Sequence, residues 1–529
     1  MKKLFFCLFV LVHYTLNAQI NLENAYTDGY VLRVDLANSG EKYYLLDAQN
    51  AVAKFYNANH TLWKTINLSI PTGATINAIN HVSENVINSD NLLEVGYTFF
   101  TNSGGLIYES RIINEAGTTL LSIPNASSIF VSQMGGLQDK IIATIQGATI
   151  SSEVYGIPSL ALEHTYTDGY VSRIDLANSG EKYYLLDAQN AAAKLYNADY
   201  TFWKSINLPI PVGAIINGIN HVSENVINSD NLLEVGYTFF TNGTGLVYES
   251  RIINEAGTTL LSIPNASSIF VSQMGGLQDK IIATIHGATT SSKVYGIPSL
   301  ALEHTYTDGY VLRVDLANLG EKYYFLDAPN ATAKFYNANH TLWKTITLPT
   351  TTGATISGIN HVSNNVINSD NLVEIGYTFF TNNGGLVYES RIINETGTTL
   401  LSIPNASSAF VSEIGGLQNK IIAAIQGTTL SSEVYGIPSF ATSVLGIDSD
   451  VSLSIYPNPT IHFLTIDNRG IGIKDMNLVS SNGEIVKSIQ SPRQKTVVDL
   501  NDLPIGVYFL IGKDQKGNVF SKKLVKQSF

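Results

Sequence analysis

The chain has 529 residues, which is more than one domain normally holds, and its 44% of apolar residues can build sizeable cores. Charged residues make up only 14%, and the formal net charge of −12 excludes a general nucleic-acid binder, which carries a basic face. Cys7 is the only cysteine, so a disulfide framework is excluded as well.

Residues 1–18 have the pattern of a secretory signal peptide. Lys2 and Lys3 form a basic start, the apolar stretch LFFCLFVLVHYTL follows, and Ala18 offers a small residue for cleavage before Gln19. This stretch is too short to span a membrane, and no later run is long and apolar enough to do so. We therefore predict a mature chain with no transmembrane segment, no thiol and a formal charge of −14.

Three copies of a 140-residue repeat follow the signal. The segments NVINSD and YESRIINE recur at this constant spacing, and so does YTDGY, at 26–30, 166–170 and 306–310. A fixed period of this kind indicates internal duplication. The predicted copies are residues 19–159, 160–299 and 300–440.

Each copy has the composition of β structure throughout. Segments such as EKYYLLDA, LLEVGYTFF and KIIATI are rich in β-branched and aromatic residues and are separated by Asn, Gly, Asp and Pro. Residues 54–66 and 111–123 align without gaps as two hairpins, with His60 and Gly117 at a left-handed turn position. One copy accommodates about three units of roughly 45 residues with four strands each, which is the size of a propeller blade. We predict an all-β, propeller-like array of about nine blades, with three separate β domains as the alternative.

The ends of the copies favour closure of the array into a ring. The second and third copies open with LALEHTY, the first opens with the related INLENAY at 20–26, and the third is followed by the different FATSVLG at 440–446. The last blade would lack a strand unless residues 20–25 supply it, and this closure removes two exposed sheet edges. An Asp-Gly pair normally predicts a tight hairpin, but in a closed ring YTDGY connects two blades. We predict the connection, and the hairpin is the alternative.

The repeats contain no recognisable catalytic or metal-binding motif. Because G-x-S-x-G, H-E-x-x-H and the calcium-loop pattern are missing, we assign no catalytic residue, no metal ligand and no cofactor. A serine-histidine-acid triad scattered along the sequence stays open. A glycosidase pair of Glu94 and Glu109 also stays open, although solvated strand-face carboxylates are the more common interpretation.

One tryptophan recurs in each copy, as Trp63, Trp203 and Trp343. A tryptophan on a strand usually packs in a core, but it can also stack on a sugar ring. Three equivalent sites would combine weak binding into avidity. We therefore treat these three side chains as candidate contacts for a glycan or another surface ligand.

From Ile447 the sequence leaves the repeat pattern. We predict a linker at 441–450 and a separate module at 451–529, whose seven short strands favour an immunoglobulin-like β-sandwich. The predicted strands are 453–455, 462–466, 474–480, 484–489, 496–500, 507–512 and 518–525.

This module contains four motifs in a characteristic order: SIYPNPT (454–460), LVSSNGEIV (478–486), LPIGVYFL (503–510) and KKLVKQ (522–527). Together they resemble the type A C-terminal sorting domain of the Bacteroidetes type IX secretion system. The resemblance implies export through the periplasm, recognition of the tail by the outer-membrane translocon and its removal by a sortase-type peptidase near 441–452. It further implies release of the cargo or its attachment to lipopolysaccharide. The residues of the sorting motifs are Tyr456, Pro457, Asn458, Pro459, Leu503, Pro504, Gly506, Tyr508, Lys522, Lys523 and Lys526.

Some of these residues also have predictable physical roles. Pro457 and Pro459 fix φ and withhold donors, which suits a sheet edge, and Gly506 permits a bend before a strand. The three lysines form a basic strip that could contact the export machinery, unless they are an ordinary solvated strand face. The whole sequence thus predicts a secreted or surface-attached, non-enzymatic protein that binds glycans or other surfaces. A polysaccharide-degrading propeller enzyme and a surface scaffold are the alternatives.

Overall fold

The computed structural model describes two stretches of the chain, 20–437 and 454–526, each with gaps. The gaps in the first stretch are residues 135, 244, 288, 369, 383, 415–416 and 428. The described segments of the second stretch are 454–456, 460, 463–467, 473–480, 485–490, 495–500, 503, 506–514 and 519–526. The chain divides into two compact units, Met1–Pro438 and Ser439–Phe529. The predicted signal peptide and the linker at 441–450 lie outside the described residues.

The strands of the first unit recur with the 140-residue period. The first set is β1 (Asn21–Tyr26), β2 (Val31–Leu36), β3 (Gly40–Asp47), β4 (Val52–Asn57), β5 (Leu62–Asn67), β6 (Thr75–Glu84), β7 (Leu93–Asn102), β8 (Leu106–Asn114), β9 (Thr119–Pro124), β10 (Ala126–Ser132), β11 (Lys140–Ile145) and β12 (Ser151–Gly156). The second set is β13 (Leu162–Tyr166), β14 (Val171–Leu176), β15 (Gly180–Asp187), β16 (Ala192–Asn197), β17 (Phe202–Asn207), β18 (Ile215–Glu224), β19 (Leu233–Asn242), β20 (Leu246–Asn254), β21 (Thr259–Pro264), β22 (Ala266–Ser272), β23 (Lys280–Ile285) and β24 (Ser291–Gly296). The third set is β25 (Leu302–Tyr306), β26 (Leu312–Leu316), β27 (Gly320–Asp327), the short 3₁₀ helix η1 (Ala328–Asn330), β28 (Thr332–Asn337), β29 (Leu342–Thr347), β30 (Thr355–Asn364), β31 (Val373–Asn382), β32 (Leu386–Asn394), β33 (Thr399–Pro404), β34 (Ala406–Ser412), β35 (Lys420–Ile425) and β36 (Ser431–Gly436).

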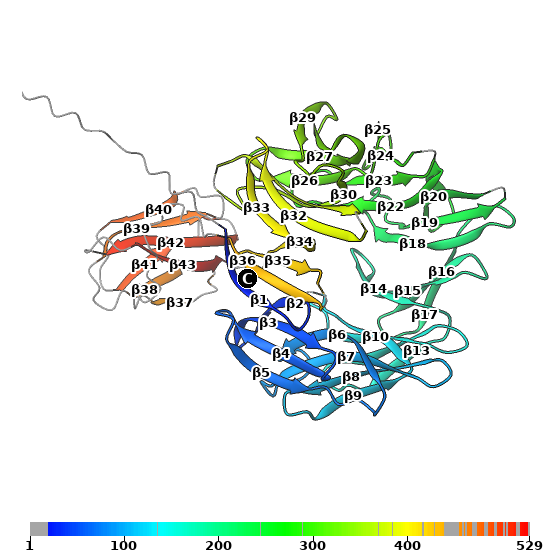
Figure 1. The fold of residues 1–529 in the computed structure, drawn as a ribbon, viewed down its shortest axis with the longest axis horizontal. Helices are drawn as coiled ribbons and strands as arrows, with labels where there is room; N and C mark the ends of the chain where they lie inside the picture. Colours follow the sequence, from blue (N-terminus) through cyan, green and yellow to red (C-terminus); the bar gives the residue numbers. More distant parts are fainter. Residues whose placement is uncertain are drawn as a thin grey trace, which may run out of the picture. The chain divides into compact units, whose positions relative to one another are not determined.

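Within the described part of this unit, the strands form nine four-stranded sheets. Eight sheets take four consecutive strands, from β2–β5 to β30–β33, and the ninth has the order β34-β35-β36-β1. The first strand of one sheet lies beside the first strand of the next, as β2 does with β6 and β6 does with β10 (Figure 1). This is the arrangement of propeller blades, and it confirms the predicted propeller-like fold.

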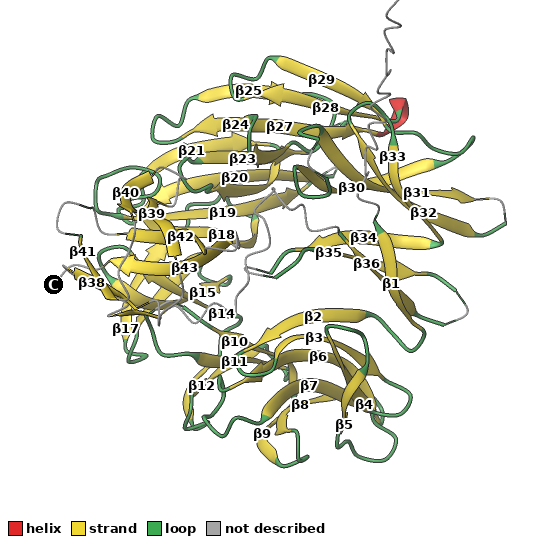
Figure 2. Ribbon diagram, turned by 90° about the vertical axis from the view of Figure 1, so that its left-hand side faces the viewer, coloured by secondary structure: helices red, strands yellow, loops and turns green. Residues whose placement is uncertain are grey.

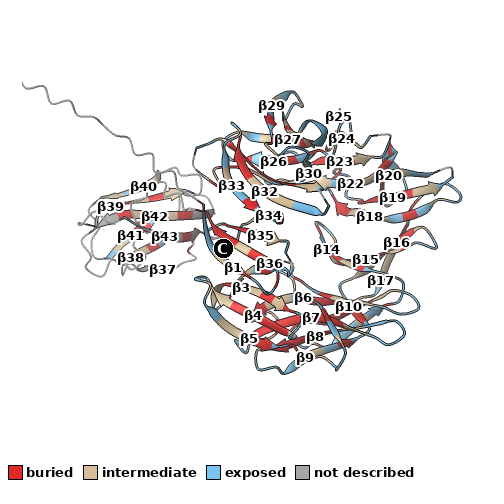
Figure 3. Cartoon of the chain, in the orientation of Figure 1, coloured by how far each residue is buried: buried red, intermediate tan, exposed pale blue. Residues whose placement is uncertain are grey.

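Apolar side chains between neighbouring blades hold the array together, and Figure 3 shows buried positions along the strands of each blade. Between the first two blades, Phe55 of β4, Ile66 of β5 and Tyr97 of β7 belong to one buried cluster. Equivalent clusters lie between the corresponding blades of the second and third copies. Because each cluster draws on two blades, one blade cannot bury its apolar surface alone.

The N-terminal strand closes the ring. β1 pairs antiparallel with β36, with Leu22 opposite Tyr435, and Figure 2 shows the two strands side by side. The Arg33 guanidinium of β2 reaches the same blade and donates to the backbone oxygens of Ser412, at 3.0 Å, and Gln418, at 2.6 Å. The predicted closure is confirmed, and YTDGY connects two blades instead of forming a hairpin.

A strained turn reinforces this closure. His60 has a φ of 64°, and Gly117 in the aligned hairpin has a φ of 79°, as predicted for a left-handed turn position. The imidazole of His60 lies 2.8 Å from the hydroxyl of Tyr26 and 3.3 Å from a carboxylate oxygen of Glu23, both on β1. The side chain therefore ties the first blade to the strand that completes the last one.

The second unit consists of two sheets around one core. The three-stranded sheet contains β37 (Ser454–Tyr456), β38 (Phe463–Asp467) and β41 (Lys495–Asp499), and the four-stranded sheet has the order β40 (Ile485–Gln490), β39 (Ile473–Ser480), β42 (Gly506–Asp514) and β43 (Val519–Lys526). Leu464 of the first sheet packs in one cluster with Met476 and Leu524 of the second. All seven strands lie within two residues of their predicted bounds. The immunoglobulin-like character of this module stays a prediction.

We expect the closing ion pair to control local opening of the ring. Glu23 of β1 contacts Lys420 at 2.6 Å, and the equivalent pair Glu163 and Lys140 contacts at 2.7 Å. β13, which carries Glu163, is joined to a strand at both ends within the ring, whereas β1 is joined only at its C-terminal end. The variant Glu23→Ala should therefore speed amide hydrogen exchange in β1 and β36 about tenfold, a cost of about 1.4 kcal/mol.

The matched control is Glu163→Ala, which removes the same kind of pair from an interior blade. Exchange in β12 and β13 should change much less than exchange in β1 and β36 does. Equal acceleration in the two variants would show that the N-terminal strand is no weaker than an interior one.

Candidate functional site

The connection between two copies forms the most developed site on the ring. We call each such boundary a seam, and the three seams are centred on the YTDGY segments that lead into β2, β14 and β26. At the third seam this segment lines a pocket together with residues of the β27–β28 connection and of the β23–β24 connection. The third seam holds a pocket with a volume of about 630 Å³.

A buried serine fixes the backbone of each seam. In the first seam, the Ser432 hydroxyl donates to the backbone oxygen of Gly29 at 3.0 Å and accepts from the backbone N–H of Val31 at 3.0 Å. Ser152 and Ser292 make the same two contacts in the other seams. The three loops are therefore attached to the preceding blade in the same way.

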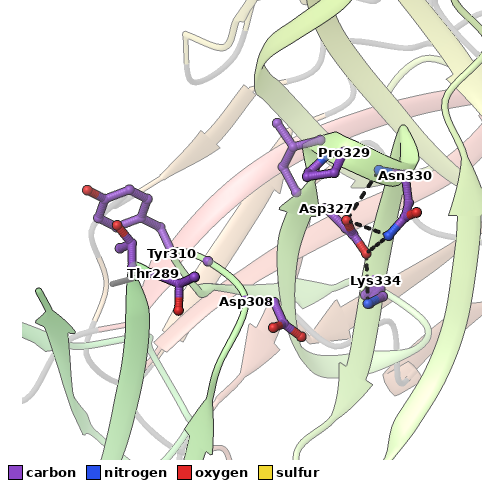
Figure 4. A pocket seen from close by; sticks show the side chains of 10 residues that line it. Thr289, Asp308, Tyr310, Asp327, Pro329, Asn330 and Lys334 are labelled. Carbon is purple, nitrogen blue, oxygen red and sulfur yellow. Dashed lines mark hydrogen bonds and ion pairs between the residues drawn. The ribbon is translucent and has the colours of Figure 1, made fainter. Parts of the chain in front are cut away.

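The pocket of the third seam has both apolar and polar lining and contains one aromatic residue (Figure 4). Its lining residues are Thr289, Thr290, Asp308, Gly309, Tyr310, Leu326, Asp327, Pro329, Asn330 and Lys334. The tyrosine is largely exposed, at 56% in Tyr310, and its counterparts Tyr30 and Tyr170 are exposed as well. In Figure 4 the ring of Tyr310 lies beside Thr289, and Asp327, Asn330 and Lys334 lie on the other side of Asp308.

One aspartate of each seam is held in its ionised form. The Asn190 side chain donates to Asp187 at 2.8 Å, and the ammonium of Lys194 lies 2.8 Å from the same carboxylate. These contacts, with the asparagine first, lower the pKa of Asp187 to about 2. The pKa values of Asp47 and Asp327 are lowered by the same pair of neighbours. Each seam therefore keeps a carboxylate acceptor at neutral pH.

The second aspartate differs between the seams. In the first seam Lys54 bridges Asp28 at 2.8 Å and Asp47 at 2.9 Å. In the second seam the ammonium of Lys194 lies farther from the carboxylate of Asp168, at 3.4 Å. In the third seam Lys334 pairs with Asp327, and Figure 4 draws no interaction from Asp308.

The exposed tyrosines were not among the residues predicted to bind a ligand. The sequence did contain a signal for them, because a repeated Tyr-Thr-Asp-Gly-Tyr segment at a blade boundary leaves its last side chain outside both sheets. The exposure of this tyrosine could be inferred only after the segment was shown to connect two blades. Neutral sugars are bound by aromatic faces together with a few directed polar groups, and these seams offer both.

The structure places the predicted tryptophans elsewhere, on the fourth strands β5, β17 and β29. Trp63 is half-buried and packs against the apolar cluster between the first two blades. The ammonium groups of Lys42 and Lys64 lie 4.8 Å and 4.3 Å from the centroid of its ring. Trp203 and Trp343 have the same two lysine neighbours. A ligand at these rings would have to displace the lysines.

The two carboxylates of the glycosidase alternative do not come together. Glu94 lies opposite Asn114 and Glu109 lies opposite Phe99, so the register separates them by five residues, or about 17 Å along the sheet. Glycosidase pairs are about 5–9.5 Å apart. Glu109 instead contacts Arg111 at 2.5 Å on its own strand.

Glu94 belongs to a buried hydrogen-bond network. The hydroxyl of Ser83 donates to Glu94 at 2.7 Å and lies 2.7 Å from Nε2 of His81. The residue types match a hydrolase triad, but here the serine lies between the other two, and Glu94 is fully buried. The carboxylate also accepts from the backbone of Asn88, so it fixes the loop that precedes β7. The same network recurs in both other copies.

The residues of the sorting motifs lie at the ends of strands in the second unit. Tyr456 ends β37, Gly506 begins β42, and Tyr508 is buried in the core. Leu503 packs against that core. Pro457, Asn458, Pro459 and Pro504 lie outside the described residues.

The three lysines near the C-terminus do not share one environment. Lys526 is buried, and its ammonium donates to the backbone oxygens of Leu500, at 2.6 Å, and Leu503. Lys522 is half-buried on the same face of β43 as the core residue Leu524. Lys523 lies between them in the strand, opposite Phe509. Lys526 thus holds the module together, in addition to any part it has in recognition.

Comparison with known proteins identifies the second unit. Residues 454–527 match the secretion system C-terminal sorting domain. The chain is therefore a cargo of the type IX secretion system that is sorted out of the cell or to its surface. No curated protein matches the chain. No helix of the described residues is long and apolar enough to cross a membrane.

Several solved structures resemble the chain at low identity. The Dos1 propeller is 10% identical, with 79% of this chain and 96% of that chain covered and a TM-score of 0.37. The dihydro-heme d1 dehydrogenase NirN is 7% identical, with 86% and 81% covered and a TM-score of 0.36. The Vibrio cholerae biofilm matrix protein Bap1 is 11% identical, with 80% and 91% covered and a TM-score of 0.34. With TM-scores below 0.5, these structures say nothing about what this chain binds.

Three half-buried histidines predict a loss of stability in mild acid. Burial lowers the pKa values of His81, His221 and His361 to about 4, from about 6.5 in an unfolded chain. The unfolded state therefore takes up protons first, so these groups stabilise the fold above pH 6.5 and lose that effect as the pH falls towards 4. The free energy of unfolding, measured in urea, should fall less between pH 7 and 5.5 when all three are replaced by Gln.

The control for this measurement is His286→Gln, which alters a histidine outside the network. Its pH profile should follow that of the wild type. A triple variant with an unchanged slope would mean that the three imidazoles do not control the acid response.

Proposed function

We propose that this protein acts outside the cell as a non-enzymatic, multivalent carbohydrate-binding protein. The observation that carries the proposal is the threefold recurrence of a seam with an exposed tyrosine next to ionised carboxylates. Carboxylate and amide oxygens accept hydrogen bonds from sugar hydroxyls, and the tyrosine offers a face for the ring. The pocket of the third seam has a volume typical of small-ligand sites.

Repetition supports a ligand that is itself repetitive. The seams are identical in backbone attachment and lie at equivalent places in one closed ring, so their mutual positions are set by the fold. A polysaccharide or a dense glycan surface can occupy several of them at once. Linked weak sites then gain about 10²–10⁴ in overall affinity without any new contact.

The route of export completes the proposal. The predicted signal peptide delivers the chain to the periplasm, and the translocon recognises the sorting domain at 451–529. A sortase-type peptidase then removes that domain by cleavage near 441–452, and the ring is released or attached to lipopolysaccharide. Every strand of the ring ends by residue 436, so cleavage there leaves all nine blades whole.

Loss of the seam tyrosines should abolish avid glycan binding. The triple variant Tyr30→Ala, Tyr170→Ala, Tyr310→Ala of the full chain should lose at least tenfold in affinity for polysaccharides on an array. Each single substitution should cost less, because two sites still act together. The same array should show no turnover of the bound polysaccharide.

The matched control replaces Leu62, Phe202 and Leu342, which are similarly exposed but lie on the fourth strands. Substituting these three with Ser should leave binding unchanged. If Trp63→Phe, Trp203→Phe and Trp343→Phe abolish binding and the tyrosine variants do not, the ligand lies on the tryptophans. Degradation of the polysaccharide would overturn the non-enzymatic assignment.

Deletion of residues 451–529 tests the export route. Without the sorting domain the chain should accumulate in the periplasm, as measured by cell fractionation and surface labelling with an antibody to the ring. The variant Pro457→Ala changes a single residue of the sorting motifs and serves for comparison with the deletion. Normal surface delivery of the truncated chain would contradict the assigned role of the tail.

A further inference from the structure

The third seam differs in sequence from the other two at the positions that shape it. Phe325 replaces Leu45 and Leu185, and Pro329 replaces Gln49 and Gln189. The proline lies in η1, which occupies the connection before β28. Elsewhere in the seam the Asp-Gly-Tyr segment, the Asp-x-x-Asn turn and the lysine are the same in all three copies.

The larger side chain of Phe325 fills space beneath the loop. A methyl group added at Gly309 would come within 3.3 Å of Cδ2 of Phe325. The ring also lies 5.9 Å from the ring of Tyr336, in a stacked orientation. In the first two seams the inner strand begins one residue earlier, where Val31 pairs with Leu45 and Val171 pairs with Leu185. In the third seam β26 begins at Leu312, so the pairing of Val311 with Phe325 is missing.

This local change separates Asp308 from its lysine. Asp28 and Asp168 are bonded to a threonine hydroxyl and to the seam lysine. Among the described residues, neither direct contact is present at Asp308. Lys334 forms an ion pair with Asp327, and its ammonium lies 5.5 Å from the centroid of the Phe325 ring. The third pocket therefore contains two carboxylates against one ammonium, and the direct ion pair of that ammonium is with Asp327.

We propose that the third seam binds a sugar that carries a primary ammonium, with Asp308 as the group that selects it. This inference rests on the proposed function and specifies the ligand class of one of its three sites. The ammonium of the sugar pairs with Asp308, as Lys54 and Lys194 pair with the equivalent aspartates. Tyr310 provides the face for the sugar ring, and Thr289 and Asn330 provide polar partners for its hydroxyls.

The charge of the site excludes the opposite ligand class. A uronic acid or a sulfated sugar would bring a second anion next to Asp308 and Asp327, and like charges at such distances repel. A neutral sugar would leave Asp308 without a charged partner. Hydrogen bonds between charged groups are stronger than those between neutral groups, so the ammonium should improve affinity by about tenfold or more.

Three oligosaccharides with one backbone test the proposal. β-1,4-linked oligomers of glucosamine, N-acetylglucosamine and glucose differ only at C2, which carries an ammonium, an acetamide or a hydroxyl. Titration calorimetry with the full chain at low salt should show about tenfold tighter binding of the glucosamine oligomer. Its affinity should fall as salt is added, because salt screens the ion pair.

Two variants locate the effect at the third seam. Asp308→Asn should remove the preference for the glucosamine oligomer over the glucose oligomer. Phe325→Leu restores the residue of the first two seams and should weaken glucosamine binding in the same way by returning Asp308 to Lys334. Asp168→Asn is the matched control, because Asp168 is already paired with Lys194, and it should have little effect.

The outcomes separate this inference from the proposed function. Equal affinity for the three oligomers, with no effect of Asp308→Asn, would overturn the inference and keep carbohydrate binding. Failure of all three to bind at any seam would count against both. A further outcome is that polylysine binds as tightly as the glucosamine oligomer and depends equally on Asp308. The site would then bind an ammonium group without a sugar, and the carbohydrate assignment would be overturned.

Discussion

The pairing of β1 with β36 is the constraint on which the ring depends. Without it, the last blade would have three strands and expose the edge of β36, and the first blade would lose the neighbour against which β2 packs. Glu23, Tyr26 and His60 reinforce that one pairing with polar contacts. An uninterrupted ring in turn gives every blade two neighbours, which is what its apolar faces require.

Closure also explains why a seam is a good place for a ligand site. A blade interior must be packed, so its positions tolerate little change. A connection between blades lies at the surface and contributes only its backbone attachment, which Ser152, Ser292 and Ser432 secure in all three copies. The side chains around that attachment are free to differ. Two substitutions in the third copy, Phe325 and Pro329, accompany the separation of an ion pair without altering any other blade.

The sequence predicted the parts of the fold that follow from period and turn chemistry. The 140-residue repeat predicted the blades, the odd ends of the first and third copies predicted closure, and alignment of two hairpins predicted the left-handed turn at His60. The seam site was harder to predict from the sequence. Asp28, Asp47 and Lys54 are separated along the chain, and only the register of the strands brings them together. The sequence predicted that Lys526 belongs to a basic strip. In the structure it shares the core face of β43 with Leu524, which lies two residues earlier in the strand. Burial of a lysine by two backbone carbonyls has no signature in local sequence.

The positions of the first and last strands of the ring bear on how the chain is exported. Asn21 at the start of β1 lies opposite Gly436 at the end of β36, so the strand that begins the ring and the strand that ends it share one hydrogen-bonded ladder. The ring can therefore close only after the chain has been made as far as residue 436, and the sorting domain begins 18 residues later. A peptidase that acts between them removes no strand of the ring and breaks none of its ladder pairs. In the proposed export route the tail can therefore be removed without loss of the closing interaction, because β1 and β36 both lie before residue 437.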